Sequence, residues 1–164
     1  MHSLRGCFQE KYRRGDTGDD KGCIGNIRSY FSTMDSADNH NTDRPVIMFA
    51  DDDADLLRLA KMRLTREGFD VRLCLNGENI IPMVISEKPD IILLDLKMDN
   101  TDGRDICLSL KTDRRTTDIP VIFISASNDL ENIARLYGVA FIHKPFSIRC
   151  IKEKIEDMLS AGAA

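Results

Sequence analysis

The sequence lacks the cysteine and histidine patterns that mark disulfide frameworks and zinc sites. Its five cysteines are an odd number, stand far apart and include no C-x-x-C pair. His2, His40 and His143 do not complete a ligand set with them. Such cysteines are typical of reduced thiols that fill small spaces in a core. We therefore expect a cytoplasmic protein without zinc or disulfides.

Long apolar runs and an excess of basic charge are also missing. No run is long enough to span a bilayer, and the N-terminus has no apolar signal core, so we expect no membrane partner. The formal net charge is −4, and residues 45–164 hold 20 acidic and 16 basic side chains. A nucleic-acid-binding domain usually carries a basic stripe, so we expect no nucleic-acid partner either.

Residues 1–44 differ in composition from the rest of the chain. They are rich in Gly, Asp, Asn, Ser and Arg, hold 7 acids and 7 bases, and show no sustained period. We expect a mostly disordered arm. Met34 is an alternative start, in which case the residues before it are an artefact of gene prediction. The expected domain covers residues 45–160, and residues 161–164 form a tail.

Five strand-like runs alternate with five segments of helical spacing. The expected strands are residues 46–50, 69–74, 91–95, 119–125 and 140–146. The expected helices are residues 53–68, 76–88, 103–113, 129–138 and 147–159. Asp53 is placed to cap the first helix and Gly68 to end it, while Pro82 should kink or shorten the second. This alternation predicts an α/β domain with a doubly wound, five-stranded parallel sheet and five flanking helices.

Residues with useful chemistry stand at the carboxyl ends of the expected strands. They are Asp51 and Asp52 after the first strand, Asp95 at the end of the third, Ser125 at the end of the fourth and Lys144 near the end of the fifth. Right-handed crossovers bring these ends to one edge of the sheet, where ligands bind in this fold class. Three carboxylates in one crevice favour a hard cation such as Mg²⁺. A lysine and a hydroxyl beside them suit phosphoryl chemistry.

Four segments around these residues resemble the signature segments of response-regulator receiver domains, the CheY-like family. They are ADDDADLLRLAKMRL, PDIILLDLKMDNTDG, IPVIFISAS and HKPF, in the order of the family, within a match over roughly residues 45–160. Each segment alone is a weak signal, and the four in order are a strong one. The resemblance implies the flavodoxin-like strand order 2-1-3-4-5.

The resemblance also implies a role for each matched residue at the phosphorylation site. Asp95 matches the carboxylate that accepts phosphate from a phosphohistidine, and Lys144 matches the lysine of the family. Mg²⁺ would be held by Asp95, by Asp52 directly, by Asp51 through water and by the backbone carbonyl of Lys97.

Further matches concern the switch that follows phosphorylation. Ser125 matches the hydroxyl that bonds the phosphoryl group, with help from the amide of Ala126. Phe141 matches the aromatic residue that turns inward when this hydroxyl is pulled toward the phosphate. Pro145 matches a proline that follows a cis peptide bond.

The chain departs from the family at several positions. Asp99 and Asn100 stand where proline and a small residue are usual, which predicts a looser loop after Asp95. Ser125 replaces the commoner threonine and should still donate, whereas Phe141 replaces tyrosine and loses a hydroxyl. The short span from Ser125 to Lys144 shortens the fourth helix. The resemblance implies that a downstream protein partner binds the face of the fourth helix, fifth strand and fifth helix, and the shorter helix alters this face.

The resulting hypothesis is a single-domain receiver of a two-component phosphorelay. A histidine kinase or histidine phosphotransfer protein would phosphorylate Asp95, and a downstream protein would read the change, with no enzyme activity beyond self-phosphorylation and autodephosphorylation. One alternative is a receiver-like binding module that keeps the fold and ignores phosphorylation. Taken by themselves, Asp51, Asp52 and Asp53 are also compatible with a turn and a helix cap. Another is a phosphatase of the haloacid-dehalogenase type, which needs a second Asp where Lys97 stands.

Overall fold

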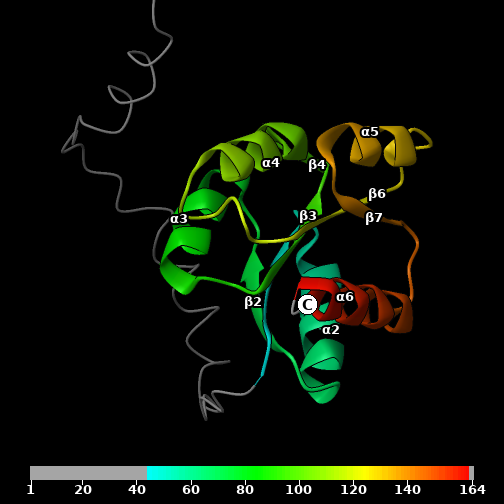
Figure 1. Cartoon of the computed structure of the whole chain (residues 1–164). Coiled ribbons are helices and arrows are strands. Elements are labelled where there is room, and N and C mark those ends of the chain that lie inside the picture. The colour runs from blue at the N-terminus through cyan, green and yellow to red at the C-terminus, as the bar shows by residue number, and fades with distance from the viewer. Residues whose placement is uncertain (1–43, 163–164) are drawn as a thin grey trace, which may run out of the picture. The chain divides into compact units, whose positions relative to one another are not determined.

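The computed structural model describes residues 44–162, so the expectations for the arm and for Met34 lie outside the described residues. The main sheet has five strands (Figure 1): β1 (Val46–Ala50), β2 (Asp70–Cys74), β3 (Ile91–Asp95), β6 (Val121–Ser125) and β7 (Ala140–His143). The helices of the described chain are α2 (Ala54–Arg66), α3 (Gly77–Glu87), α4 (Gly103–Thr112), α5 (Leu130–Tyr137) and α6 (Ile148–Gly162).

The sheet has the predicted topology. Its strand order is β2-β1-β3-β6-β7, and every neighbouring pair is parallel, which confirms the order 2-1-3-4-5. Helices α2 and α6 cover one face, and α3, α4 and α5 cover the other (Figure 1). All strand ends that carry the candidate site therefore meet at one edge of the sheet.

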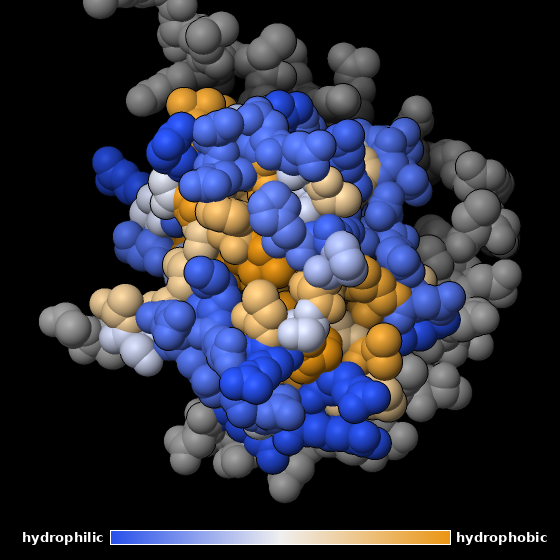
Figure 2. Space-filling model, turned by 90° about the vertical axis from the view of Figure 1, so that its right-hand side faces the viewer, coloured by the Kyte–Doolittle hydropathy of each residue, from blue (hydrophilic) through white to orange (hydrophobic). Residues whose placement is uncertain are grey.

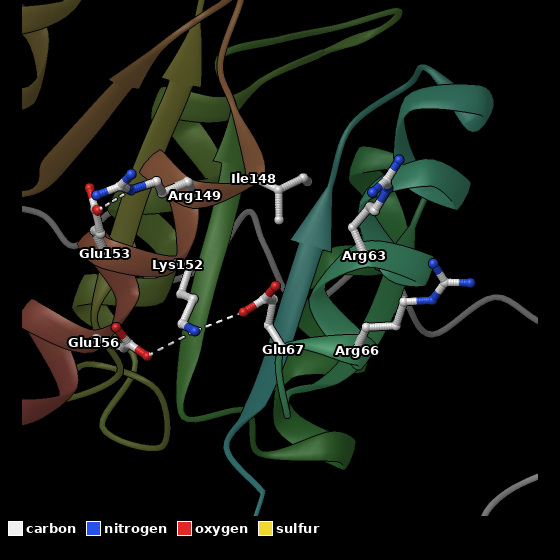
Figure 3. A pocket seen from close by; sticks show the side chains of 8 residues that line it. All are labelled: Arg63, Arg66, Glu67, Ile148, Arg149, Lys152, Glu153 and Glu156. Atoms are coloured by element: carbon white, nitrogen blue, oxygen red, sulfur yellow. Dashed lines mark hydrogen bonds and ion pairs between the residues drawn. The ribbon is translucent and has the colours of Figure 1, made fainter.

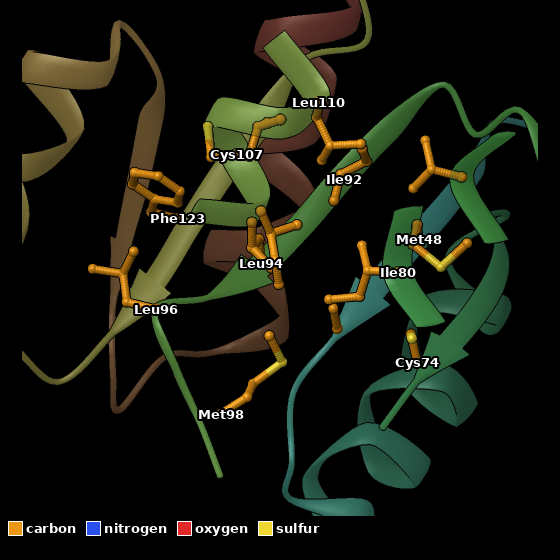
Figure 4. Close-up of a cluster of buried hydrophobic side chains, with 14 of the residues drawn as sticks. Met48, Cys74, Ile80, Ile92, Leu94, Leu96, Met98, Cys107, Leu110 and Phe123 are labelled. Carbon is orange, nitrogen blue, oxygen red and sulfur yellow. The ribbon is translucent and has the colours of Figure 1, made fainter. Parts of the chain in front are cut away.

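The central strands are buried on both faces. Every residue of β3 and of β6 is buried. One set of side chains, which includes Ile92 and Phe123, packs with α3, α4 and α5 (Figure 4), while Leu93 and Ile122 pack toward α2 and α6. This two-sided burial explains why these strands are continuous apolar runs without alternation. It also holds Asp95, at the tip of β3, in a fixed place.

The helix ends mostly follow the sequence signals. The Asp53 side chain accepts hydrogen bonds from the N–H groups of Asp55 and Leu56, as expected for the cap of α2. Gly68 follows that helix with a φ of 97°. Within the described chain, no helix is both long enough and apolar enough to cross a membrane.

Of the kink or shortening predicted for α3 at Pro82, the shortening does not occur. The helix continues through Pro82 to Glu87. A proline removes only one backbone donor, and the buried side chains of Ile80 and Val84, on either side of it, hold the helix against the sheet. Helix α6 also runs beyond its predicted end, to Gly162, since Ser160 and Ala161 can both continue a helix.

The expected loose loop after Asp95 is also wrong. Strands β4 (Lys97–Met98) and β5 (Thr101–Asp102) form a short antiparallel hairpin, with Lys97 opposite Asp102 and Met98 opposite Thr101. Met98 is 5% exposed and packs in the core with α3 and α4 (Figure 4). The buried Met98 side chain therefore anchors this loop, although its turn residues Asp99 and Asn100 predicted a looser one.

Candidate functional site

The predicted carboxylates meet at the edge of the sheet. One oxygen of each of Asp51, Asp52 and Asp95 lies within 4.8 Å of the others. Asp51 is 0% exposed and Asp95 is 5% exposed, whereas Asp52 is exposed to solvent. Asp51 and Asp95 are thus buried, and Asp52 is the carboxylate of the three that faces solvent.

Backbone groups hold the two buried acids. Asp51 directly follows β1, and its Oδ1 accepts a hydrogen bond from the Asp53 N–H at 3.0 Å. Asp95 Oδ1 accepts one from the Lys97 N–H at 3.3 Å. Gly103 lets α4 begin directly against Asp95, because a Cβ there would lie 2.3 Å from the Asp95 carbonyl oxygen. The acceptor carboxylate is therefore fixed by β3, by the following loop and by the start of α4.

Lys144 connects the two buried acids. Its Nζ lies 2.7 Å from Asp51 Oδ2 and 2.8 Å from Asp95 Oδ2, and only the second contact has the angles of a hydrogen bond. Burial alone would lower the pKa of the Lys144 ammonium, but its contacts with both carboxylates outweigh this and raise the pKa. The lysine is therefore held in its charged form. The Lys144–Pro145 peptide bond is cis, as the resemblance implied.

Ser125 lines the same pocket from the end of β6. The pocket has a volume of about 240 Å³ and is lined by Asp95, Lys97, Ser125, Ala126, Ser127 and Lys144. Ser125 is 3% exposed, and its Oγ accepts a hydrogen bond from the Ser127 N–H at 3.2 Å. A hydroxyl, an ammonium and a carboxylate thus face one small space, which suits a phosphoryl group.

The donor set at the edge of the sheet fits a hard cation. All three acids offer oxygen ligands, which Mg²⁺ prefers. Asp51 Oδ2 is buried and makes no hydrogen bond of good geometry within the described chain. Burial raises the pKa of Asp51, against the opposing effect of Lys144, because a buried carboxylate is poorly solvated. A divalent cation would offset this cost.

Phe141, the predicted switch residue, lies in β7 beside the site. It is partly buried and packs against the core under α5. Ser125 is paired with His143 in the sheet, so Phe141 stands two residues before the partner of Ser125. Its ring packs edge-on against the His143 ring, with a centroid distance of 5.5 Å. Phe141 therefore lies in the edge strand of the sheet, near the strand end that carries the site.

The prediction from sequence missed one contact at the site. The backbone N–H of Asp99, in the hairpin turn, donates a hydrogen bond to Asp52 Oδ2 at 3.2 Å. The signal was visible in the sequence, because proline would stand at this position in the family pattern and proline has no N–H.

A second crevice lies between α2 and α6 (Figure 3). Lys152 bonds Glu67 at 2.7 Å, and Arg149 bonds Glu153 at 2.8 Å, so much of its charge is paired internally. None of the residues predicted to carry chemistry lines it. The edge of the sheet is therefore the candidate site.

The chain is similar in sequence to several named regulators. NisR of Lactococcus lactis, named a nisin biosynthesis regulatory protein, is 35% identical over 116 residues, which are 67% of this chain and 48% of NisR. BaeR of Escherichia coli is 32% identical over 70% of this chain and 48% of its own length. RpaA of Synechocystis, named a DNA-binding regulator, is 28% identical over 70% of this chain and 49% of its own length. The chain spans about half the length of the regulators it matches.

Solved structures show the same fold. The N-terminal domain of the nisin resistance regulator NsrR is 30% identical, with a TM-score of 0.63 over 71% of this chain and 99% of that domain. A CheY-like receiver domain from Methanospirillum hungatei has a TM-score of 0.67 at 23% identity, over 73% of this chain and 97% of its own. The family model described as the response regulator receiver domain matches residues 47–156. The chain therefore belongs to the response regulator receiver domain family, the receiver domains of two-component response regulators.

Proposed function

We propose that this receiver accepts a phosphoryl group on Asp95 from a phosphohistidine of a histidine kinase or histidine phosphotransfer protein. The observation that carries the proposal is the convergence of Asp95, Lys144 and Ser125 on one pocket, next to the carboxylates of Asp51 and Asp52. An Asp95 oxygen attacks phosphorus, the new O–P bond forms, and the N–P bond to the histidine breaks.

The surrounding residues stabilise the charge that moves in this step. Asp51, Asp52, Asp95 and the Lys97 carbonyl would hold Mg²⁺, whose positive charge would neutralise the phosphoryl oxygens. Lys144 places its ammonium beside Asp95 and offers a second positive charge to those oxygens. Ser125 and the Ala126 amide supply neutral donors from the other wall of the pocket.

Phosphorylation would then shift the protein between two conformations that a partner distinguishes. Ser125 moves toward the phosphoryl group, and Phe141 turns inward into the space beside it. The partner would read the face formed by α5, β7 and α6. Figure 2 shows apolar surface at the centre of this side of the molecule, surrounded by hydrophilic residues. Phe141 in β7 is only partly buried, as are Phe146 and Ile148 further along the chain.

Neither alternative function has such support. A phosphatase of the haloacid-dehalogenase type needs an acid two positions after the nucleophile, and Lys97 at that position is exposed. A phosphorylation-independent module would have no use for an oxygen cluster with a buried, poorly solvated Asp51.

The test is phosphorylation of Asp95→Asn with acetyl phosphate and Mg²⁺, followed by intact mass. The unmodified protein should gain one phosphoryl group, and the variant none. Asp105→Asn is the matched control, because Asp105 is an exposed acid in the first turn of α4. Continued labelling of the Asp95 variant would overturn the assignment. Absence of labelling in the unmodified protein would favour the binding module, and turnover of a phosphate ester would favour the phosphatase.

A further inference from the structure

We propose that the backbone N–H of Asp99 positions Asp52, and that the β4–β5 hairpin thereby sets how tightly the strand-end site binds a divalent cation. This inference rests on the proposed function, because it takes Asp52 to be a metal ligand. Proline stands at the position of Asp99 in the family pattern, and proline has no backbone N–H, so this hydrogen bond depends on the departure from that pattern.

The three carboxylates are held in different ways. Asp51 and Asp95 each accept an N–H from the residue two positions further along the chain. Asp52 accepts its N–H from Asp99, which is 47 positions away. Within residues 44–162 this is the one hydrogen bond that the Asp52 side chain makes. Asp52 is also exposed, so burial does not hold it in place.

The hairpin is anchored well enough to present this N–H. On one side Met98 is buried in the core. On the other side Thr101 packs against the start of α3 so closely that a Cβ at Gly77 would lie 2.4 Å from the Thr101 Cβ. Because both strands of the hairpin pack against the protein, the Asp99 N–H keeps its orientation toward Asp52.

The C-terminal end of the hairpin is tied to α4 and to β3. Asp102 caps α4 by accepting the Arg104 N–H at 2.9 Å, and its carboxylate also bonds the Arg104 guanidinium. The Gly103 N–H donates to the Leu96 carbonyl at 3.0 Å. The turn at Asp99 is therefore fixed relative to the acceptor strand, and through its N–H it fixes Asp52 relative to Asp95.

Hydrogen bonds to metal ligands usually matter for affinity. They orient the ligand before the metal arrives, and their removal typically costs about 10–100-fold in metal affinity. Asp52 is exposed and makes no other side-chain hydrogen bond within residues 44–162, so the orientation supplied by Asp99 should contribute much of its affinity for the metal. We expect an effect of about tenfold, at the lower end of this range.

The chain allows a clean removal of this N–H. Both central residues of the turn, Asp99 and Asn100, have negative φ, because Lys88 is the one described residue other than glycine with positive φ. Proline is favoured at the first central position of such a turn, as in type I. Met98 before it is extended, which is the conformation that a following proline requires. Asp99→Pro should therefore keep the hairpin.

The experiment compares Asp99→Pro with Asp99→Ala. Both lack the carboxylate of Asp99, and only the proline lacks the N–H. Mg²⁺ is titrated into each protein, and the dissociation constant is read from backbone amide shifts in NMR spectra. Binding about tenfold weaker in the proline variant than in the alanine variant supports the proposal. Equal dissociation constants overturn it.

A second measurement requires no proline, so it decides the question if Asp99→Pro fails to fold. In the unmodified protein the Asp99 amide should exchange slowly with solvent, and Asp52→Ala should make it exchange faster. An Asp99 amide that is indifferent to Asp52→Ala overturns the proposal. If the unmodified protein binds no Mg²⁺, the metal site and this inference both fall. If it binds Mg²⁺ and is phosphorylated on Asp95 while the two Asp99 variants agree, only this inference falls.

Discussion

Replacing Lys144 with methionine removes the positive charge that two buried carboxylates share. Lys144 Nζ lies 2.7 Å from Asp51 and 2.8 Å from Asp95, which are 0% and 5% exposed. Methionine keeps most of the length and apolar stem of the side chain. The variant therefore isolates the loss of the ammonium, which leaves two acids close together without a counter-charge.

The contact geometry sets the size of the effect. At an effective dielectric constant of about 20, a contact of this length is worth roughly 6 kcal/mol before desolvation is subtracted. Removing one partner of a buried ion pair costs about 3–5 kcal/mol in measured cases. The Lys144 side chain is 22% exposed, so solvent screens part of the interaction. We expect the metal-free protein to lose about 2–3 kcal/mol of its free energy of unfolding.

The loss should depend on pH in a defined direction. Burial raises the pKa of Asp51 above its ordinary value of 3.8, and removal of Lys144 should raise it further. A carboxyl whose folded-state pKa is raised destabilises the fold above that pKa, where it must be charged while buried. Below its unfolded-state pKa it is neutral in both states. The difference between the two proteins should therefore be largest at neutral pH and shrink as the pH falls.

Urea unfolding in the presence of EDTA measures this effect. Lys152→Met is the matched control, because Lys152 makes an ion pair of 2.7 Å with Glu67 while both side chains are about a third or more exposed. That variant should lose less than about 1 kcal/mol. Added Mg²⁺ should restore part of the stability of Lys144→Met, since it binds the folded state. Equal stability of Lys144→Met and the unmodified protein at neutral pH would refute the reasoning.

Two further predictions concern the frame of the site. Gly103→Ala should lower the free energy of unfolding by about 1–3 kcal/mol, since the new Cβ would meet backbone atoms that cannot turn away. Urea unfolding measures it, and an unchanged midpoint would contradict the close approach of α4 to β3. Asp102→Ala should cost about 1 kcal/mol through loss of the α4 cap. Asp129→Ala should cost less, because Asp129 caps no N–H of α5; equal losses would contradict the assigned roles.

The sequence predicted the architecture well and failed at particular residues. The runs at 46–50 and 91–95 are strands with the predicted bounds, because two-sided burial leaves a continuous apolar signal. Helix α3 lies almost at its predicted bounds and is not shortened at Pro82, since the packing of Ile80 and Val84 outweighs one lost backbone donor. Asp99 and Asn100 suggested a loose loop. The burial of Met98, which anchors the hairpin, is a tertiary contact and could not be predicted from the local sequence.

By itself, the sequence determined the alternation of strands and helices and the identity of the residues at the strand ends. Both can be predicted from local sequence signals, namely the hydrophobic period and the helix-capping residues. The tertiary structure alone decided the distances from Lys144 to its two acids, the raised pKa of Asp51 and the bond from the Asp99 N–H to Asp52. These depend on burial and on contacts between residues far apart in the chain, which only packing around the sheet brings together.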